Sequence, residues 1–373
     1  MKRISMNLNH FLDVYLSPIT GIIIVISFIL IPRSVLAIGL NFDYYTKVKF
    51  EYQYSDYEEF KWQPYIEYNF GKHEYTQPNP FLNSFPEHRG LTKITQGFGQ
   101  NFELQLMYHY SYQGKEYYYD DTGNQGVFDT EEGFYNARGE YMVNNNLTVN
   151  GTIQYSEATA GLLDANTRKV ADLRGWMGDF GFIYDFGGFF KIEQSISLFY
   201  NKVDDIDGGY VNSNAQSYNL KLRQALSHTT ATQVKFNYFN SDPVAEEKGL
   251  RYGTFTWWIS QWLPTESAVH FNLRYHKDNQ GITSFGPGIE VSHYLNWATI
   301  LTLSYRNNKM ISDNPESDFY EVVRKGSFHS NAFTAMVTRT IWGDTIFVLK
   351  YRYYTTNQNI SINTYMFSIE QVI

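Results

Sequence analysis

From residue 44 onward, apolar and polar side chains alternate along the chain with a period of two. In one segment the apolar residues are Phe102, Leu104, Leu106, Tyr108, Tyr110 and Tyr112. In another, Val269, Phe271, Leu273 and Tyr275 alternate with His270, Asn272, Arg274 and His276. Successive side chains of a β-strand point to opposite faces, so this period predicts strands with one apolar and one polar face. No helical period interrupts it, and the chain is predicted to be all-β.

The composition narrows the classes of protein that such strands can build. The mean hydropathy of −0.40 excludes a helical membrane protein, which needs several apolar runs of about 20 residues. The 43% hydrophobic content, with 18% aromatic residues, is high enough to exclude a disordered chain. The chain has no cysteine, which excludes disulfides, thiol catalysis and Cys-ligated metal centres.

The N-terminus has the features of an export signal. Lys2 and Arg3 precede an apolar stretch at 19–31, which is too short to span a bilayer as a helix. Val35 and Ala37 suit the −3 and −1 positions of a signal peptidase site, so residues 1–37 are predicted to be a signal peptide; an uncleaved anchor is the alternative. Cleavage would remove three basic residues and one acidic residue, which changes the net charge from −8 to −10. Such an acidic exported chain is not expected to bind nucleic acid.

The alternating segments predict about sixteen strands, with fourteen or eighteen as alternatives. They span residues 44–54, 61–70, 98–112, 134–143, 147–156, 175–184, 189–200, 216–226, 231–240, 251–261, 268–277, 284–294, 298–307, 328–339, 344–354 and 361–371. Short turns alternate with longer polar links, among them 113–133, 157–174 and 308–327. This alternation is typical of an antiparallel up-and-down transmembrane β-barrel with short periplasmic turns and long outer loops. Residues 38–373 are therefore assigned to one barrel.

One segment does not fit this alternation. Residues 71–97 fall where a short turn is expected, and they contain Pro78, Pro80 and Pro86. An additional strand there would make the count odd, whereas bacterial single-chain barrels have even counts. The segment is therefore interpreted as an irregular periplasmic or inward-folded excursion.

Aromatic residues mark the two edges of the predicted sheet. Each strand predicted to run outward carries a tyrosine near its outer end, on the apolar face: Tyr54, Tyr112, Tyr155, Tyr200, Tyr238, Tyr275, Tyr305 and Tyr353. Trp262, Trp297 and Trp342 lie in or beside short turns at the other edge. Two aromatic belts around an apolar band are typical of strands that cross a bilayer. These residues are predicted to form the lipid-interface girdles.

With its export signal, alternating strands and aromatic belts, the chain resembles a Gram-negative outer-membrane β-barrel of the porin-like kind. The resemblance covers residues 44–373 and is architectural, without a narrower family. It implies a location in the bacterial outer membrane, with outer-membrane lipid as the surrounding partner.

If the apolar face meets lipid, the polar face lines the interior, and there basic residues outnumber acidic ones. The predicted pore-lining cations are Lys191, Lys221, Arg223, Lys235, Arg274, Arg306, Lys350 and Arg352. A basic wall raises the local concentration of anions. The sequence thus favours a water-filled pore with a mild anion preference. In the alternative interpretation these charges pair across adjacent strands and solvate or plug the interior.

The candidates for chemistry are weak. Asp204, Asp205 and Asp207 precede two glycines and could wrap a calcium ion, but the bidentate Glu of a full calcium loop is missing. A solvated acidic loop is the favoured interpretation, with no metal and no cofactor. His270 and His276 share a face but lie about 20 Å apart along a strand, too far to chelate one metal. The chain is not expected to be an enzyme.

The favoured function is passive or weakly selective diffusion of small hydrophilic solutes through a porin-like channel. The first alternative is a scaffold barrel that sheathes or docks an electron carrier or an efflux or secretion component. The second is a hydrophobic-substrate importer, for which residues 38–43 are too short to form a plug, and the third is an outer-membrane enzyme. A homo-oligomer or a periplasmic partner is possible.

Overall fold

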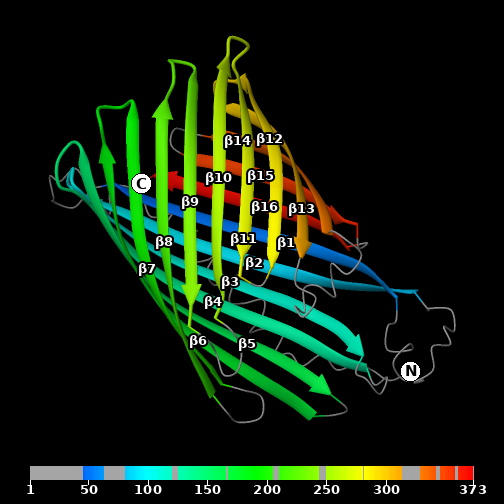
Figure 1. Ribbon diagram of the computed structural model, residues 1–373. Coiled ribbons are helices and arrows are strands. Elements are labelled where there is room, and N and C mark those ends of the chain that lie inside the picture. Colours follow the sequence, from blue (N-terminus) through cyan, green and yellow to red (C-terminus); the bar gives the residue numbers. More distant parts are fainter. Residues whose placement is uncertain are drawn as a thin grey trace.

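The strands of the chain close into a single antiparallel barrel. The computed structural model describes residues 45–62, 80–119, 125–164, 167–204, 210–242, 249–279, 281–312, 328–341, 345–357 and 360–372. Within these ranges there are sixteen strands, each paired with its sequence neighbours, and β1 pairs with β16 to complete the ring (Figure 1). None of the described residues forms a helix that could cross a membrane. The predicted signal peptide, residues 1–37, lies outside the described ranges.

The strand bounds are as follows. The first eight strands are β1 (Thr46–Trp62), β2 (Pro80–Phe98), β3 (Phe102–Tyr119), β4 (Gln125–Met142), β5 (Leu147–Asp164), β6 (Thr167–Asp185), β7 (Phe190–Asp204) and β8 (Tyr210–Ala225). The second eight are β9 (Thr230–Ser241), β10 (Arg251–Leu263), β11 (Ser267–Asp278), β12 (Ile282–Asn296), β13 (Thr299–Ser312), β14 (Phe328–Ile341), β15 (Thr345–Thr356) and β16 (Ile360–Val372).

The two ends of the barrel differ in their connections. Every turn from an even-numbered strand to the next odd-numbered strand has two to four residues. At the opposite end, the connections range from two residues between β5 and β6 to seventeen between β1 and β2. In outer-membrane β-barrels the short turns lie on the periplasmic side. The odd-numbered strands begin at the short turns here, so in that orientation they run outward.

The wall of the barrel is taller on one side. Strands β1–β6 have 17 to 19 residues, whereas β9–β16 have 12 to 15. A bilayer needs only about 9–11 tilted residues per strand, so the hairpins β3–β4 and β5–β6 continue beyond the outer surface, toward the lower right of Figure 1. The predicted links 113–133 and 157–174 are therefore mostly strand.

The predicted course of the chain between 61 and 97 is wrong in part. Lys61 and Trp62 end β1, and the rest of the predicted strand 61–70 lies outside the described residues. Residues 80–97, expected to be part of an irregular excursion, belong to β2, which pairs with β1 over residues 80–96 and with β3 over residues 87–98. The described strands still number sixteen. Residues 71–79 are not among those described.

The distribution of side chains is the reverse of that in a soluble protein. Most of the buried side chains are polar, among them Ser55, Ser197, Thr302 and Ser368, and only Val48, Phe50 and Ala332 are buried hydrophobic residues in the described part. Large hydrophobic side chains are instead exposed on the outside, as Ile153 and Phe180 are at 64% and 66%. An apolar exterior around a polar interior requires lipid as the outer solvent.

Val48 and Phe50 belong to the seam where the barrel closes. They pack with Tyr52 of β1 and with Phe367 and Ile369 of β16. Phe50 stands directly across from Ile369, and Tyr52 stands across from Phe367. Apolar contact thus joins the first strand of the barrel to the last, as closure of the sheet requires.

Candidate functional site: the inner wall of the barrel

The strand register places all eight predicted pore-lining cations on the inner face. Side chains directly across from each other on neighbouring strands share a face. Arg223 stands across from Lys191, and Lys235 stands across from Lys221. On the other side of the barrel, Arg274, Arg306, Lys350 and Arg352 share the face of the buried polar residues Thr256, Thr302 and Ser330. Their role in a pore is taken up below as a proposal.

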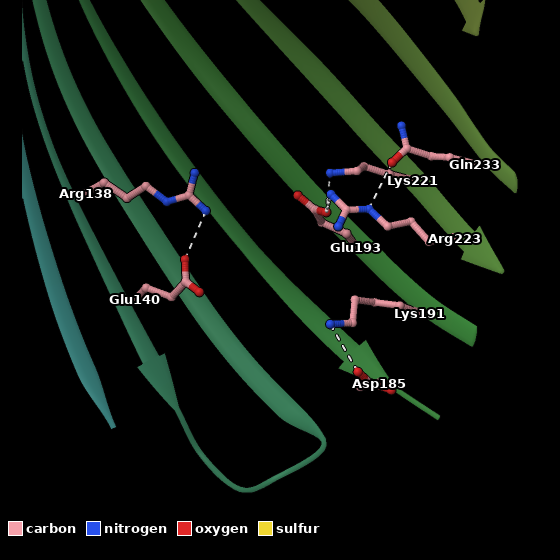
Figure 2. A network of polar contacts seen from close by, with 8 residues as sticks. All are labelled: Arg138, Glu140, Asp185, Lys191, Glu193, Lys221, Arg223 and Gln233. Carbon is pink, nitrogen blue, oxygen red and sulfur yellow. Dashed lines mark hydrogen bonds and ion pairs between the residues drawn. The ribbon is translucent and has the colours of Figure 1, made fainter. Parts of the chain in front are cut away.

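In the half of the wall formed by β1–β8, most basic side chains contact carboxylates; Lys47 and Lys93 have none within 4.0 Å in the described part of the chain. Arg138 contacts Glu140 at 3.2 Å, Lys191 contacts Asp185 at 3.1 Å, and Lys49 contacts Glu51 at 2.8 Å. Glu193 lies 2.7 Å from Nζ of Lys221 and 3.8 Å from Arg223, which also donates to the amide oxygen of Gln233 (Figure 2). Arg89 forms a tight pair with Glu87. In this half some charges pair across adjacent strands, as Lys191 and Lys221 do, and others pair within one strand, as Arg138 does.

In the half formed by β9–β15, the basic side chains have no such partners. Lys235, Arg274, Arg306, Lys350 and Arg352 have no carboxylate within 4.0 Å among the residues that the structure describes. Glu290 brings an acidic group near this surface through its electrostatic interaction with Arg306, and Asp278 does so beside His276 at the end of β11. We call these five residues the basic arc. Its charge is not cancelled locally.

Three members of the basic arc line a groove in the inner wall. The groove has a volume of about 230 Å³ and includes Arg306, Lys350 and Arg352, with the hydroxyls of Ser304 and Thr334 between them. Ser304, Thr334 and Arg352 stand directly across from one another on β13, β14 and β15. The guanidinium of Arg352 lies over the ring of Tyr354, 5.7 Å from its centre.

The histidines of the inner wall contact hydroxyl groups rather than one another. Nδ1 of His270 lies 2.7 Å from Oγ of Ser260, and Nδ1 of His276 lies 3.0 Å from Oγ1 of Thr254. No cluster of three metal-ligating side chains occurs within the described ranges. Asp204 ends β7, whereas Asp205 and Asp207 lie outside those ranges, so the weak calcium prediction stays untested.

The eight predicted girdle tyrosines all lie on the outer face of their strands. From one odd-numbered strand to the next, three of the tyrosines lie at the same level as the tyrosine before them. The others are displaced by two to four residues toward the periplasmic end, as strand tilt requires. The girdle continues on the neighbouring strands of Tyr155, where the ring centres of Tyr135 and Trp176 lie 6.1 and 4.8 Å from that of Tyr155. His88 stands between Tyr54 and Tyr112 at the same level. The predicted girdle thus omitted residues of the even-numbered strands.

One of the three predicted girdle tryptophans, Trp262, differs from the prediction. Trp262 lies on the inner face of β10, with Trp258 and Thr256, and packs edge-on against Tyr294 at the periplasmic rim. Trp262 is therefore not a lipid-facing residue. Because aromatic residues occupy both faces of β10, the sequence does not show which face of this strand is the outer one. Trp297 is 90% exposed in the turn between β12 and β13, and Trp342 lies outside the described ranges.

The sequence analysis also missed a polar contact at the periplasmic mouth. The hydroxyl of Tyr45, just before β1, donates a hydrogen bond to Glu103, which raises the pKa of the phenol to about 12. The Tyr45 ring lies where a Cβ on Gly97 would be, so this position requires glycine. Tyr45 lies in the predicted strand 44–54, but its contact with Glu103 depends on how β1, β2 and β3 pair, which the alternation does not specify.

Comparisons with known proteins agree with the architecture. No protein-family model and no curated protein matches the chain. CdiB from Acinetobacter baumannii superposes with a TM-score of 0.53 and 10% identity over 87% of this chain, which spans 60% of that protein. The P. putida toluene transporter TodX gives 0.49, with 9% identity over 91% of this chain and 92% of that one. OccD3 from Pseudomonas aeruginosa gives 0.47, with 9% identity over 90% and 93%.

At these identities the likeness concerns the fold alone. Antiparallel closure, an apolar exterior and a ring of outward-facing tyrosines are the features of strands that cross a bilayer. The chain therefore has the fold of a transmembrane β-barrel, with sixteen strands among its described residues.

Proposed function

We propose that the chain is an outer-membrane channel through which small hydrophilic solutes diffuse, with a preference for anions. A barrel of sixteen strands leaves an aqueous opening rather than a core filled by side chains. The observation that carries the proposal is the basic arc, five cations on the inner wall that no carboxylate of the described ranges contacts.

The anion preference follows from the difference between the two halves of the wall. The ion pairs of β1–β8 have little net charge, so their field weakens within a few ångströms. The five charges of the basic arc exceed the single carboxylate of Glu290 beside them, and the low-dielectric barrel wall strengthens their field in the lumen. Anions therefore accumulate along β9–β15, whereas small cations gain no comparable site on that surface.

The alternative functions have less support. The scaffold hypothesis drew on residues 71–97 as a contact for a periplasmic partner, but residues 80–98 are an ordinary strand of the wall. A homo-oligomer or a periplasmic partner stays a prediction. No observation on the described residues favours an importer or an enzyme over a channel.

Single-channel recording tests the proposal. Residues 38–373 would be refolded, shown by circular dichroism to be β-rich, and inserted into a planar bilayer. We expect steady openings, together with swelling of liposomes that carry the protein when small sugars are added. A folded barrel that neither conducts nor admits sugars would overturn the channel and favour the scaffold, for which capture of a periplasmic protein is the next measurement.

A further inference from the structure

We propose that the groove formed by Arg306, Lys350 and Arg352 is a binding subsite for a phosphate group, either as free phosphate or as the phosphoryl group of a small solute. The inference deepens the proposed function by naming a class of anion, and it rests on that function for the route by which the anion reaches the groove.

The first argument is charge. Three cations and one carboxylate, that of Glu290, line the groove, which leaves a formal charge of about +2 when these four groups are counted. Arg306 also experiences the positive charges of Arg352 and Arg274. Cations held together without counterions repel one another, so an anion that bridges them is bound favourably. A dianion matches this excess better than chloride or a monocarboxylate does.

The second argument is geometry. Ser304, Thr334 and Arg352 form a row across three strands, and neighbouring strands lie about 4.8 Å apart. Arg306 follows Ser304 by two residues, and Lys350 precedes Arg352 by two, so both flank the row on the same face. Glu290 continues the row on β12, directly across from Ser304. The groove therefore offers two guanidinium groups, one ammonium and two hydroxyls to a single ligand, with one carboxylate at the β12 end of the row.

The third argument is the type of donor. Two of the three cations are arginines, whose planar guanidinium binds two oxygens of a phosphate at once. Tyr354 contacts the face of the Arg352 guanidinium, which restricts its orientation and leaves its N–H edge for a ligand. Chloride, a single sphere, cannot use this bidentate geometry.

Competition with chloride current tests the subsite in the intact barrel. Inorganic phosphate at pH 8, where it is mostly a dianion, is added to channels that conduct potassium chloride. We expect a saturable reduction of the current by phosphate and by methyl phosphate, and none by acetate at the same concentration. Block by phosphate alone would assign the site to the free ion, and block by both would assign it to the phosphoryl group. Equal block by acetate would overturn the proposal.

Paired variants locate the site. R306Q/R352Q removes two charges from the groove, and we expect phosphate affinity to fall by about tenfold or more, as the loss of two charge-assisted contacts implies. R89Q/R138Q removes the same charge from the opposite half, where both arginines already contact carboxylates, and should change the affinity less than about twofold. Equal losses in the two variants would indicate general electrostatics and contradict a subsite. K350M provides a milder second variant should the double substitution not fold.

Direct binding separates this inference from the channel itself. Isothermal titration of the refolded barrel in detergent micelles with inorganic phosphate does not depend on conduction. Binding that R306Q/R352Q abolishes, in a protein that does not conduct, would support the subsite and reject the channel. An anion-preferring channel that binds no phosphate would reject the subsite and keep the channel.

Discussion

Lys221 of β8 and Lys235 of β9 stand directly across from each other on the inner wall, yet only Lys221 is neutralised. Its Nζ lies 2.7 Å from Oε2 of Glu193, whereas Lys235 has no carboxylate within 4.0 Å in the described part of the chain. The boundary between the paired half and the basic arc therefore runs between two adjacent strands. One barrel thus presents two electrostatically different walls to the same lumen.

The anion preference should depend strongly on salt. The basic arc acts through an open lumen, and the screening length falls from about 10 Å at 0.1 M salt to about 3 Å at 1 M. We expect the permeability ratio of chloride to potassium to approach the ratio of their mobilities as the salt concentration rises. Reversal potentials at constant gradient and increasing mean concentration measure this. A ratio independent of salt would mean that the preference arises from steric selection instead.

A new charge should destabilise the outer face of β15 much more than its inner face. Leu349 is 50% exposed on the outer face, and its neighbour Val348 lies on the inner face, across from Thr338 and Ser368. Leu349→Lys should cost about 2–4 kcal/mol of folding stability in lipid, because the ammonium would sit in the apolar band. Val348→Lys, the matched control, places the same charge in water and should cost about 1 kcal/mol or less. Urea unfolding in lipid vesicles compares them, and similar losses would contradict the assigned faces.

The periplasmic turn between β6 and β7 depends on glycine and on one carboxylate. Gly187 and Gly188 have φ angles of 85° and 86°, and Oδ1 of Asp185 accepts a hydrogen bond of 2.7 Å from the N–H of Gly188. Gly188→Ala should lower the free energy of unfolding by about 1–2 kcal/mol, since a Cβ disfavours this left-handed conformation. Gly178→Ala is a suitable control, because a Cβ there meets nothing within 4 Å. Equal unfolding midpoints for the two variants would refute the argument from φ.

The alternation of apolar and polar residues was sufficient to predict the fold class and the face on which most side chains lie. It worked where one face is continuously apolar, as in β3 and β11, because a register slip would expose that face. It failed in β2, where Glu87, His88 and Arg89 are consecutive and polar on both faces. It also failed at Trp262, in a strand with aromatic residues on both faces.

The two-residue alternation shows which charges share a face within one strand, but not which charges meet across strands. Arg138 and Glu140 lie two residues apart on one strand, a spacing that places them on one face. Lys221 and Glu193 meet only because β7 and β8 have a particular register, which the sequence does not specify. That no described carboxylate contacts Arg306 or Arg352 likewise depends on what the three neighbouring strands, β12, β14 and β16, place beside them.

The most direct test of the account is the reversal potential of the refolded barrel in a planar bilayer with a potassium chloride gradient. We predict a potential of the sign expected for chloride permeation in the wild type and in R138Q/E140Q, which removes a neutral pair from the opposite wall. In R306Q/R352Q the potential should move toward zero. A wild-type potential of the sign expected for potassium, or one that R306Q/R352Q leaves unchanged, would contradict the proposal that the basic arc sets the selectivity of the channel.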